Sequence, residues 1–147
     1  MSVNDGRYAA LLARIDNTVV LGPELLRNPV WIATATTHWS IGSGWGTPSA
    51  GTITATSATG GMVQTSSLFA VGKTYRVSYQ VVTLTAGNVR FQFTGGSHHT
   101  GVSRSAVGVY EEDVKISETI ASFRIINGGT AFSGTLCNLS VREVLSI

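Results

Sequence analysis

Strict alternation of apolar and polar residues is the feature that most constrains how this chain folds. Between residues 74 and 81, apolar side chains occupy every second position, at Tyr75, Val77, Tyr79 and Val81. The same alternation recurs over residues 89–93, 121–125 and 137–142. A period of two places the apolar side chains of a β-strand on one face, so each segment predicts a strand with one buried face.

Glycine-rich turns separate these segments and define the fold class. Shorter apolar runs near Ile53, over residues 62–65 and over residues 114–116 predict additional strands. Glycine recurs between the strands, at Gly42–Gly46, Gly60-Gly61, Gly72, Gly87, Gly95-Gly96 and Gly128-Gly129. About eight short strands joined by such turns are typical of sandwiches and jelly rolls. The sequence therefore predicts an all-β fold, an antiparallel β-sandwich (jelly roll).

The N-terminal residues follow a different pattern. Residues 7–15 carry apolar side chains at helical spacing, which predicts a short helix. A helix this short is marginal alone in water, so its apolar face needs a surface on the domain or on another subunit. An extended connector with Pro23 follows, so we predict an N-terminal arm with a short helix over residues 1–24 and the sandwich over residues 25–147. The residues expected to attach the arm to protein are Tyr8, Leu11, Leu12, Ile15, Val19, Val20 and Leu21.

Composition limits the partners of the chain. It is 43% hydrophobic and 12% charged, and its ten Lys and Arg residues are spread singly against eight acids. Nucleic-acid binders usually show a basic patch or stripe, so no nucleic-acid partner is expected. No apolar run approaches the roughly 18 residues that span a bilayer, so no membrane partner is expected. Residues 1–8 show no signal-peptide pattern, and a single cysteine fits folding in a reducing cytoplasm.

No motif predicts catalysis, a metal site or a cofactor. Gly72-Lys73-Thr74 lacks the earlier glycine of a phosphate loop and precedes a strand rather than a helix. Adjacent residues of an extended chain point in opposite directions, which separates His98 from His99 and divides the acids of Glu111-Glu112-Asp113. Cys137 is expected on the apolar face of its strand as a buried, inert thiol. We therefore expect no enzyme, with glycan degradation as the least favoured activity.

Two sets of side chains are candidate glycan contacts. The ring of Trp45, between Gly44 and Gly46, is either displayed for stacking on a sugar or packed in the core, and the core is favoured for Trp31 and Trp39. The second set projects from the polar sides of predicted strands and comprises Arg76, Gln80, Arg90, Gln92 and Arg124. If their strands are neighbours, these residues form one Arg/Gln face that could bind sugar hydroxyls, acidic groups or a partner protein. An ordinary solvated sheet face is the alternative.

Four segments of the chain resemble a known group of domains. They are Asn28–Trp31, Trp39–Trp45, Gly72–Tyr79 and Gly134–Val144. Together they resemble the galactose-binding-like, carbohydrate-binding-module-like jelly rolls of tailed-phage and prophage virion proteins, over most of the chain. Related modules often carry an aspartate that helps to hold a structural calcium ion where this chain has Cys137. A thiol is a poor ligand for calcium, so the resemblance implies no calcium here, and it transfers no sugar-binding residue.

The resemblance implies a virion structural protein, located in the virion and assembled in the host cytoplasm. Because the chain combines one small jelly roll with an apolar arm, we expect a capsid decoration (cement) protein. Its arm would attach it to the major capsid protein or to another virion protein. We also expect a homo-oligomer, with a trimer favoured. The alternative is a tail- or fibre-associated adhesion module that binds a host surface glycan, and the two roles are not exclusive.

Overall fold

The computed structural model describes residues 19–27, 38–47 and 51–146, and within these ranges it contains strands, turns and irregular segments. The helix expected at residues 7–15 lies outside the described residues, and so do the four arm residues Tyr8, Leu11, Leu12 and Ile15. In the part of the chain that is described, no helix is long and apolar enough to cross a bilayer.

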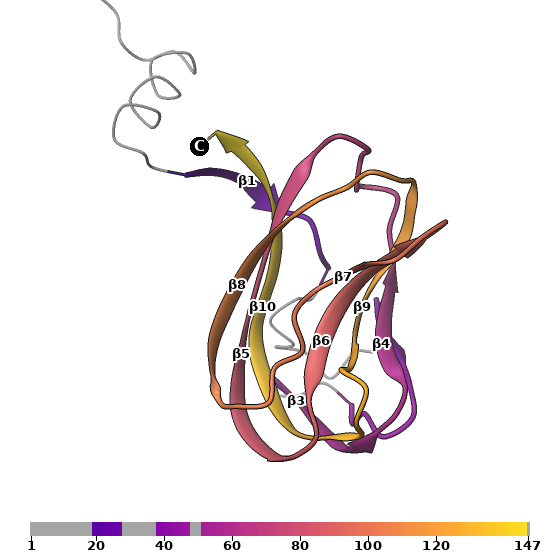
Figure 1. The fold of residues 1–147 in the computed structure, drawn as a ribbon, viewed down its shortest axis with the longest axis vertical. Helices are drawn as coiled ribbons and strands as arrows, with labels where there is room; N and C mark the ends of the chain where they lie inside the picture. Colours follow the sequence, from indigo (N-terminus) through magenta and orange to yellow (C-terminus); the bar gives the residue numbers. More distant parts are fainter. Residues whose placement is uncertain (1–18, 28–37, 48–50, 147) are drawn as a thin grey trace, which may run out of the picture.

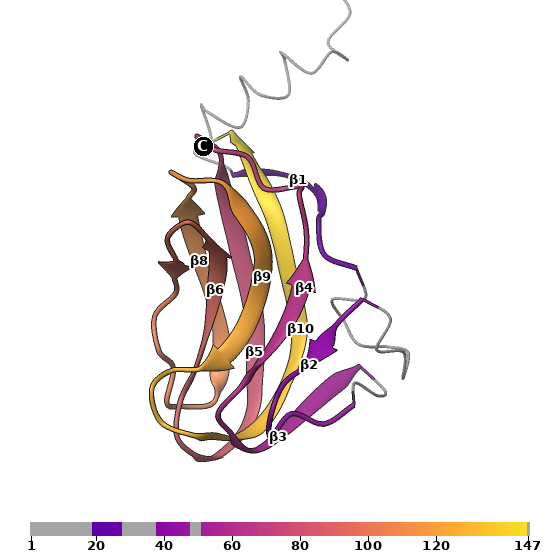
Figure 2. The ribbon, with the colours of Figure 1, turned by 90° about the vertical axis from the view of Figure 1, so that its right-hand side faces the viewer.

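Two antiparallel sheets pack face to face (Figure 1, Figure 2). The strands of sheet A are β1 (Val20–Glu24), β3 (Thr52–Ala58), β5 (Thr74–Ala86), β8 (Gly108–Lys115) and β10 (Phe132–Ser146). Their order is β1-β10-β5-β8, and β3 also pairs with β10. The strands of sheet B, in the order β2-β4-β9-β6-β7, are β2 (Ser40–Ile41), β4 (Gly61–Thr65), β9 (Ile120–Asn127), β6 (Val89–Gly95) and β7 (His99–Thr100). The prediction of an all-β antiparallel sandwich is confirmed.

The core lies between the sheets and comes from the inward faces of their strands. In β5, the four apolar residues of the 75–81 segment are all buried, as their alternation predicts. Aromatic side chains fill much of the space between the sheets. Phe93 lies edge-on to Phe69 and to Phe123, with ring centroids 5.0 Å and 5.2 Å away. Edge-to-face pairs of this kind stabilise a core beyond the apolar area that they bury.

An irregularity in β10 changes which face its residues occupy. Asn138 has a φ of 55°, a left-handed conformation that Asn adopts more readily than most residues, and the register with β5 shifts after Cys137. Leu136 and Leu139 are therefore both buried although they are three residues apart. Cys137 pairs with Gln80 on the outer face and is half-buried. The prediction that Cys137 lies on the apolar face is wrong, because a bulge interrupts the alternation.

Part of the expected arm is built into sheet A. Val20 and Leu21 lie in β1, which pairs with the C-terminal part of β10. The pairing continues past the expected end of the arm, since the Leu25 N–H donates to the Val141 carbonyl at 3.0 Å. Val19 directly precedes this strand and is half-buried. The first residues of the sandwich are thus found before residue 25, and the attachment role of the arm stays a prediction.

Candidate functional site

Both described tryptophans are core residues. Trp45 is only 6% exposed, and its indole Nε1 donates to the Gly60 carbonyl at 2.8 Å. Gly44 has a φ of 87°, and a Cβ atom there would clash with the backbone of β3, so glycine lets the chain pass close to that strand. The interpretation of Trp45 as a displayed sugar-stacking ring is therefore wrong. Trp39 is buried as expected, and Trp31 lies outside the described residues.

The five Arg and Gln candidates lie on two different sheets. Arg76 and Gln80 project outward from β5 of sheet A, whereas Arg90 and Gln92 are in β6 and Arg124 is in β9 of sheet B. The outer faces of the two sheets lie on opposite sides of the core (Figure 2). The expected single Arg/Gln face is therefore not formed, because β5 pairs with β8 and β10 and not with β6 or β9. Alternation assigns side chains to a face within one strand, and it does not identify the neighbouring strand.

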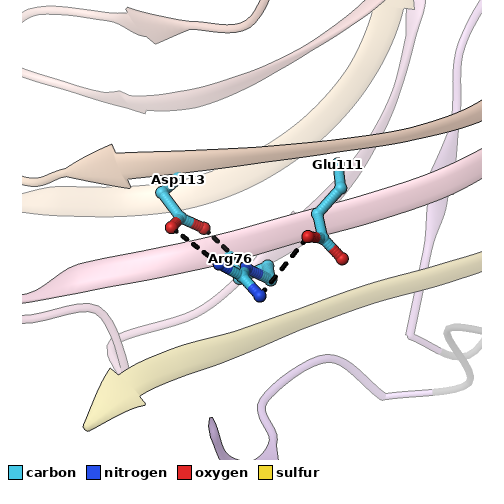
Figure 3. Close-up of polar contacts among 3 residues, drawn as sticks. All are labelled: Arg76, Glu111 and Asp113. Atoms are coloured by element: carbon cyan, nitrogen blue, oxygen red, sulfur yellow. Dashed lines mark hydrogen bonds and ion pairs between the residues drawn. The ribbon is translucent and has the colours of Figure 1, made fainter. Parts of the chain in front are cut away.

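On the outer face of sheet A, Arg76 is neutralised by acids of the neighbouring strand. Its Nε and Nη2 donate to Oδ1 and Oδ2 of Asp113 at 2.8 Å and 2.9 Å, a bidentate pair, and its Nη1 lies 3.3 Å from Glu111 Oε1 (Figure 3). The hydrogen bonds to Asp113 are the largest cause that raises the pKa of Arg76. A guanidinium held by two carboxylates has little capacity left for a ligand.

Other polar groups on this face are also bonded within the protein. The Glu24 carboxylate accepts from the Ser140 hydroxyl at 2.5 Å and from the Val141 N–H at 2.9 Å. Arg142 donates through Nε to the Gly22 carbonyl at 2.5 Å. These contacts join β1 to β10. These charged groups therefore hold the strands of sheet A together.

The acidic run of β8 divides between the two sides of its strand, as expected for adjacent residues. Glu111 and Asp113 face outward toward Arg76, whereas Glu112 accepts from Arg104, with its Oε2 3.2 Å from Arg104 Nη2. Close to this inner pair, burial is the largest cause that raises the pKa of Tyr79, to about 12. All three acids serve internal contacts.

The outer face of sheet B holds a row of hydrogen-bonded side chains. The strand register aligns Val63 of β4, Arg124 of β9, Gln92 of β6 and Thr100 of β7. Arg124 donates through Nε to Gln92 Oε1 at 2.6 Å, and Gln92 donates through Nε2 to the Thr100 hydroxyl at 3.2 Å. Gln92 is only 5% exposed. A buried amide therefore fixes the arginine, while the terminal nitrogens of Arg124 keep no acceptor among the described residues.

Arg90 lies next to this row on the same face. It pairs with Ile126 of β9, one diagonal step from Arg124, and it is half-buried. Its Nε is buried and has no hydrogen-bond partner among the described residues. We call the surface formed by these side chains the Arg90–Arg124 face, which comprises Arg90, Gln92, Thr94, Thr100, Ser122 and Arg124.

A pocket of about 650 Å³ adjoins the Arg90–Arg124 face where Ser40 and Val63 continue the row. Beneath it, Gln64 is buried and bonds twice to the backbone of Arg27, accepting from its N–H at 2.7 Å and donating to its carbonyl at 2.8 Å. The described lining residues are Leu25, Arg27, His38, Trp39, Ser40 and residues 63–68. None of these is acidic.

The histidine pair gives no metal site in the described residues. His99 Nε2 lies 2.9 Å from the Ser117 hydroxyl and accepts from the Ser117 N–H at 3.2 Å, whereas His98 is exposed. No group of three or more His, Cys, Asp or Glu residues in the described ranges is placed to hold a metal ion.

Comparisons with known proteins identify the fold. No protein-family model matches the chain, and no curated protein matches its sequence. The structure is similar to a family 29 carbohydrate-binding module described as complexed with cellulohexaose, with a TM-score of 0.55 and 12% identity over 85% of this chain and 91% of that one. A module of the same family complexed with mannohexaose gives a TM-score of 0.55 and 13% identity over 85% of this chain and 92% of that one.

A third structure, described as BiXyn10A CBM1 in its apo form, gives a TM-score of 0.54 and 16% identity over 85% of this chain and all of that one. The chain has the β-sandwich fold of a carbohydrate-binding module. At these identities the likeness shows the fold alone. The neighbours agree with the expected carbohydrate-binding-module-like sandwich, and the virion role stays a prediction.

Sequence reasoning missed the feature that distinguishes the two faces. It placed Arg90, Gln92 and Arg124 on outward positions, and the structure confirms those positions. It did not show that Glu111 and Asp113 of β8 lie beside Arg76 of β5, because the sequence does not show that these two strands pair. With the pairing of β5 and β8 known, Asp113 would have been recognised as the partner of Arg76.

Proposed function

We propose that this domain is a non-catalytic glycan-binding module whose ligand lies across the Arg90–Arg124 face. The observation that carries the proposal is the contrast between the two outer faces. Arg76 on sheet A is paired with Asp113 and Glu111, whereas no carboxylate among the described residues pairs with Arg90 or Arg124 on sheet B. The fold shared with carbohydrate-binding modules supports the same function.

The side chains of this face are suited to bind hydroxyl groups. Gln92 is held between Arg124 and Thr100, so little side-chain entropy remains to be lost when a ligand binds. The hydroxyls of Thr94 and Ser122 contact one another beside it, and hydroxyls both donate and accept. Guanidinium and hydroxyl groups side by side on this sheet face offer both donors and acceptors to a sugar ring.

Recognition on this face depends on hydrogen bonds rather than on aromatic stacking. Trp39 and Trp45, the described tryptophans, are both buried. No tyrosine or phenylalanine is among the exposed large apolar residues of the described ranges. We therefore expect binding driven by enthalpy, with a small change in heat capacity, because little apolar surface becomes buried.

A matched pair of substitutions tests the proposed face. Ser122→Gln places a long side chain on the Arg90–Arg124 face, and Ser78→Gln places the same side chain on the outer face of sheet A; both serines are half-buried residues of inner strands. The unaltered chain is screened on a glycan array, and its best ligand is then titrated by calorimetry into both variants. Binding that is weakened only by Ser122→Gln supports the proposal.

Two outcomes would count against it. Weakened binding in Ser78→Gln alone would show that the ligand binds on the outer face of sheet A instead. No binding to any glycan on the array, by a chain whose thermal unfolding is cooperative, would remove the glycan-binding function itself.

We further propose that the domain is a tail- or fibre-associated adhesion module that binds a host surface glycan. The sequence resemblance to tailed-phage virion proteins supports this setting. Gold-labelled antibodies against the chain, applied to virions of the encoding phage, provide the test. Label on the tail is expected. Label spread over the head would instead favour a capsid decoration protein, attached to the major capsid protein.

A further inference from the structure

The Arg90–Arg124 face carries two positive charges and no compensating acid. Arg90 pairs with Ile126 and Arg124 pairs with Gln92, so the two arginines are diagonal neighbours on adjacent strands. Diagonal positions of this kind are about 7–8 Å apart between Cα atoms, within reach of one another's long side chains. In the described part of sheet B, no outward-facing strand position holds Asp or Glu.

The acids of the described sandwich lie elsewhere and are engaged. Glu111 and Asp113 bind Arg76 on the opposite face, and Glu112 binds Arg104. Glu118, in the loop before β9, accepts from the Ser97 hydroxyl at 2.8 Å. Like charges on neighbouring strands destabilise a sheet, so the unpaired arginines lower stability unless an anion binds them.

We propose that the ligand of this face is an acidic saccharide, a glycan that bears carboxylate or sulfate groups. This inference rests on the proposed glycan-binding function and specifies its substrate class. A guanidinium offers parallel N–H donors that match a carboxylate or sulfate in a bidentate arrangement. The hexaoses named for the similar structures are uncharged sugars. Two arginines with no acidic partner among the described residues are poorly suited to them, because neutral hydroxyls leave both charges uncompensated.

The adjoining pocket supports the same ligand class. Arg27 and His38 line it, and its described lining contains no acid. An acidic chain lying along the row from Thr100 to Val63 would therefore reach the pocket without meeting a negative side chain.

The test compares acidic glycans with uncharged forms of the same chains. Hexagalacturonate and its methyl ester form the carboxylate pair, and a κ-carrageenan hexasaccharide with its desulfated form makes the sulfate pair. Calorimetric titrations use the full chain, Arg90→Gln, Arg124→Gln and the control Lys115→Gln. Lys115 is an exposed residue of β8 and pairs with Thr74 on sheet A, so the control removes the same charge from the opposite side.

We expect one acidic member to bind at least about tenfold more tightly than its neutral form, since hydrogen bonds between charged groups are about twice as strong as neutral ones. Each arginine substitution is expected to weaken this binding about tenfold, and Lys115→Gln is expected to leave it unchanged. The member that binds identifies carboxylate or sulfate as the group recognised. Thermal unfolding curves show that each variant is folded.

Other outcomes overturn the inference. Equal or tighter binding of the neutral forms would overturn it while leaving the glycan-binding proposal standing. Loss of affinity in Lys115→Gln equal to that in the arginine variants would show attraction to net charge rather than to this face. Equal binding of double-stranded DNA of the same charge would show a general polyanion site. Failure of all glycans to bind would remove the underlying function.

Discussion

Arg124 donates through Nε to Oε1 of Gln92 at 2.6 Å, so a buried glutamine orients an arginine whose terminal nitrogens have no acceptor among the described residues. Gln92 is itself held by Thr100 from the edge strand β7. The guanidinium of Arg124, which would contact the ligand, is thus oriented by side chains of β6 and β7. A binding residue oriented in advance loses less conformational entropy when the ligand arrives.

Gln92→Glu is predicted to separate binding from stability. The substitution places a carboxylate beside Arg124, where it neutralises the guanidinium and competes with an acidic ligand. We expect the affinity for an acidic saccharide to fall at least about tenfold, while unfolding stays cooperative because the buried carboxylate is paired with Arg124. Calorimetry and urea unfolding measure the two effects. Gln80→Glu on sheet A is the control, and unchanged affinity in Gln92→Glu would contradict the prediction.

Gln64→Ala is predicted to destabilise the fold. Gln64 is 4% exposed and satisfies both the N–H and the carbonyl of Arg27, and the substitution leaves these backbone groups without their partner. Loss of such bonds costs about 1–3 kcal/mol for each group that remains buried. Urea unfolding should show a loss of roughly 2–4 kcal/mol. Hydrogen exchange of the Arg27 amide should accelerate, and an amide that exchanges at the original rate would show that another group holds this segment.

Tyr79→Phe is predicted to reduce the alkaline sensitivity of the fold. Burial raises the pKa of Tyr79 from 10.0 to about 12, so the folded protein retains the phenolic proton more strongly than the unfolded chain. That contribution is complete below pH 10 and is lost as the pH rises from about 10 to about 12, by roughly 3 kcal/mol.

The hydroxyl of Tyr79 is buried without a hydrogen-bond partner among the described residues, so Tyr79→Phe should cost little stability at pH 7. Urea unfolding at pH 7, 10 and 11.5 should show a smaller decrease for the variant than for the original chain. Parallel decreases in both proteins would assign the alkaline loss to other groups.

The thiol of Cys137 is predicted to react slowly. Burial raises its pKa, and the thiolate is the reactive form. Its alkylation by iodoacetamide at pH 8 should be several-fold slower in the folded protein than in urea, because less thiolate is present and access is reduced. Mass spectrometry of timed samples measures both rates. Equal rates in the two conditions would mean that Cys137 is neither shielded nor shifted in the fold.

The sequence predicted the strands better than it predicted their neighbours. Alternation is a local property, so the outward positions of Arg90 and Arg124 followed from it directly. Strand order depends on contacts between distant segments, which is why Arg76 was grouped with residues that lie on the far side of the core. Asp113, the residue that distinguishes Arg76 from Arg90, is 37 positions away from Arg76 in the chain.

Two local features also escaped the pattern. The left-handed Asn138 reverses the alternation of β10, and no hydrophobic period marks that site in advance. Trp45 was flanked by glycines that suit either a displayed loop or a close backbone approach. The structure shows the close approach, because the backbone of β3 lies where a Cβ of Gly44 would be. For Trp45, tertiary packing decided between two interpretations that the sequence left equal, whereas at Asn138 it overturned the single prediction that the alternation of β10 gave.

The position of β10 has a consequence for how the chain folds during synthesis. This strand follows all the other described strands in sequence, yet it lies between β5 on one side and β1 and β3 on the other. All described strands of sheet B are synthesised before β10. In sheet A, β1 and β3 can pair with β10 only after residues 132–146 have been synthesised. A nascent chain that stalls before residue 132 would leave sheet A incomplete and part of its apolar core exposed to solvent, where chaperones and aggregation compete for it.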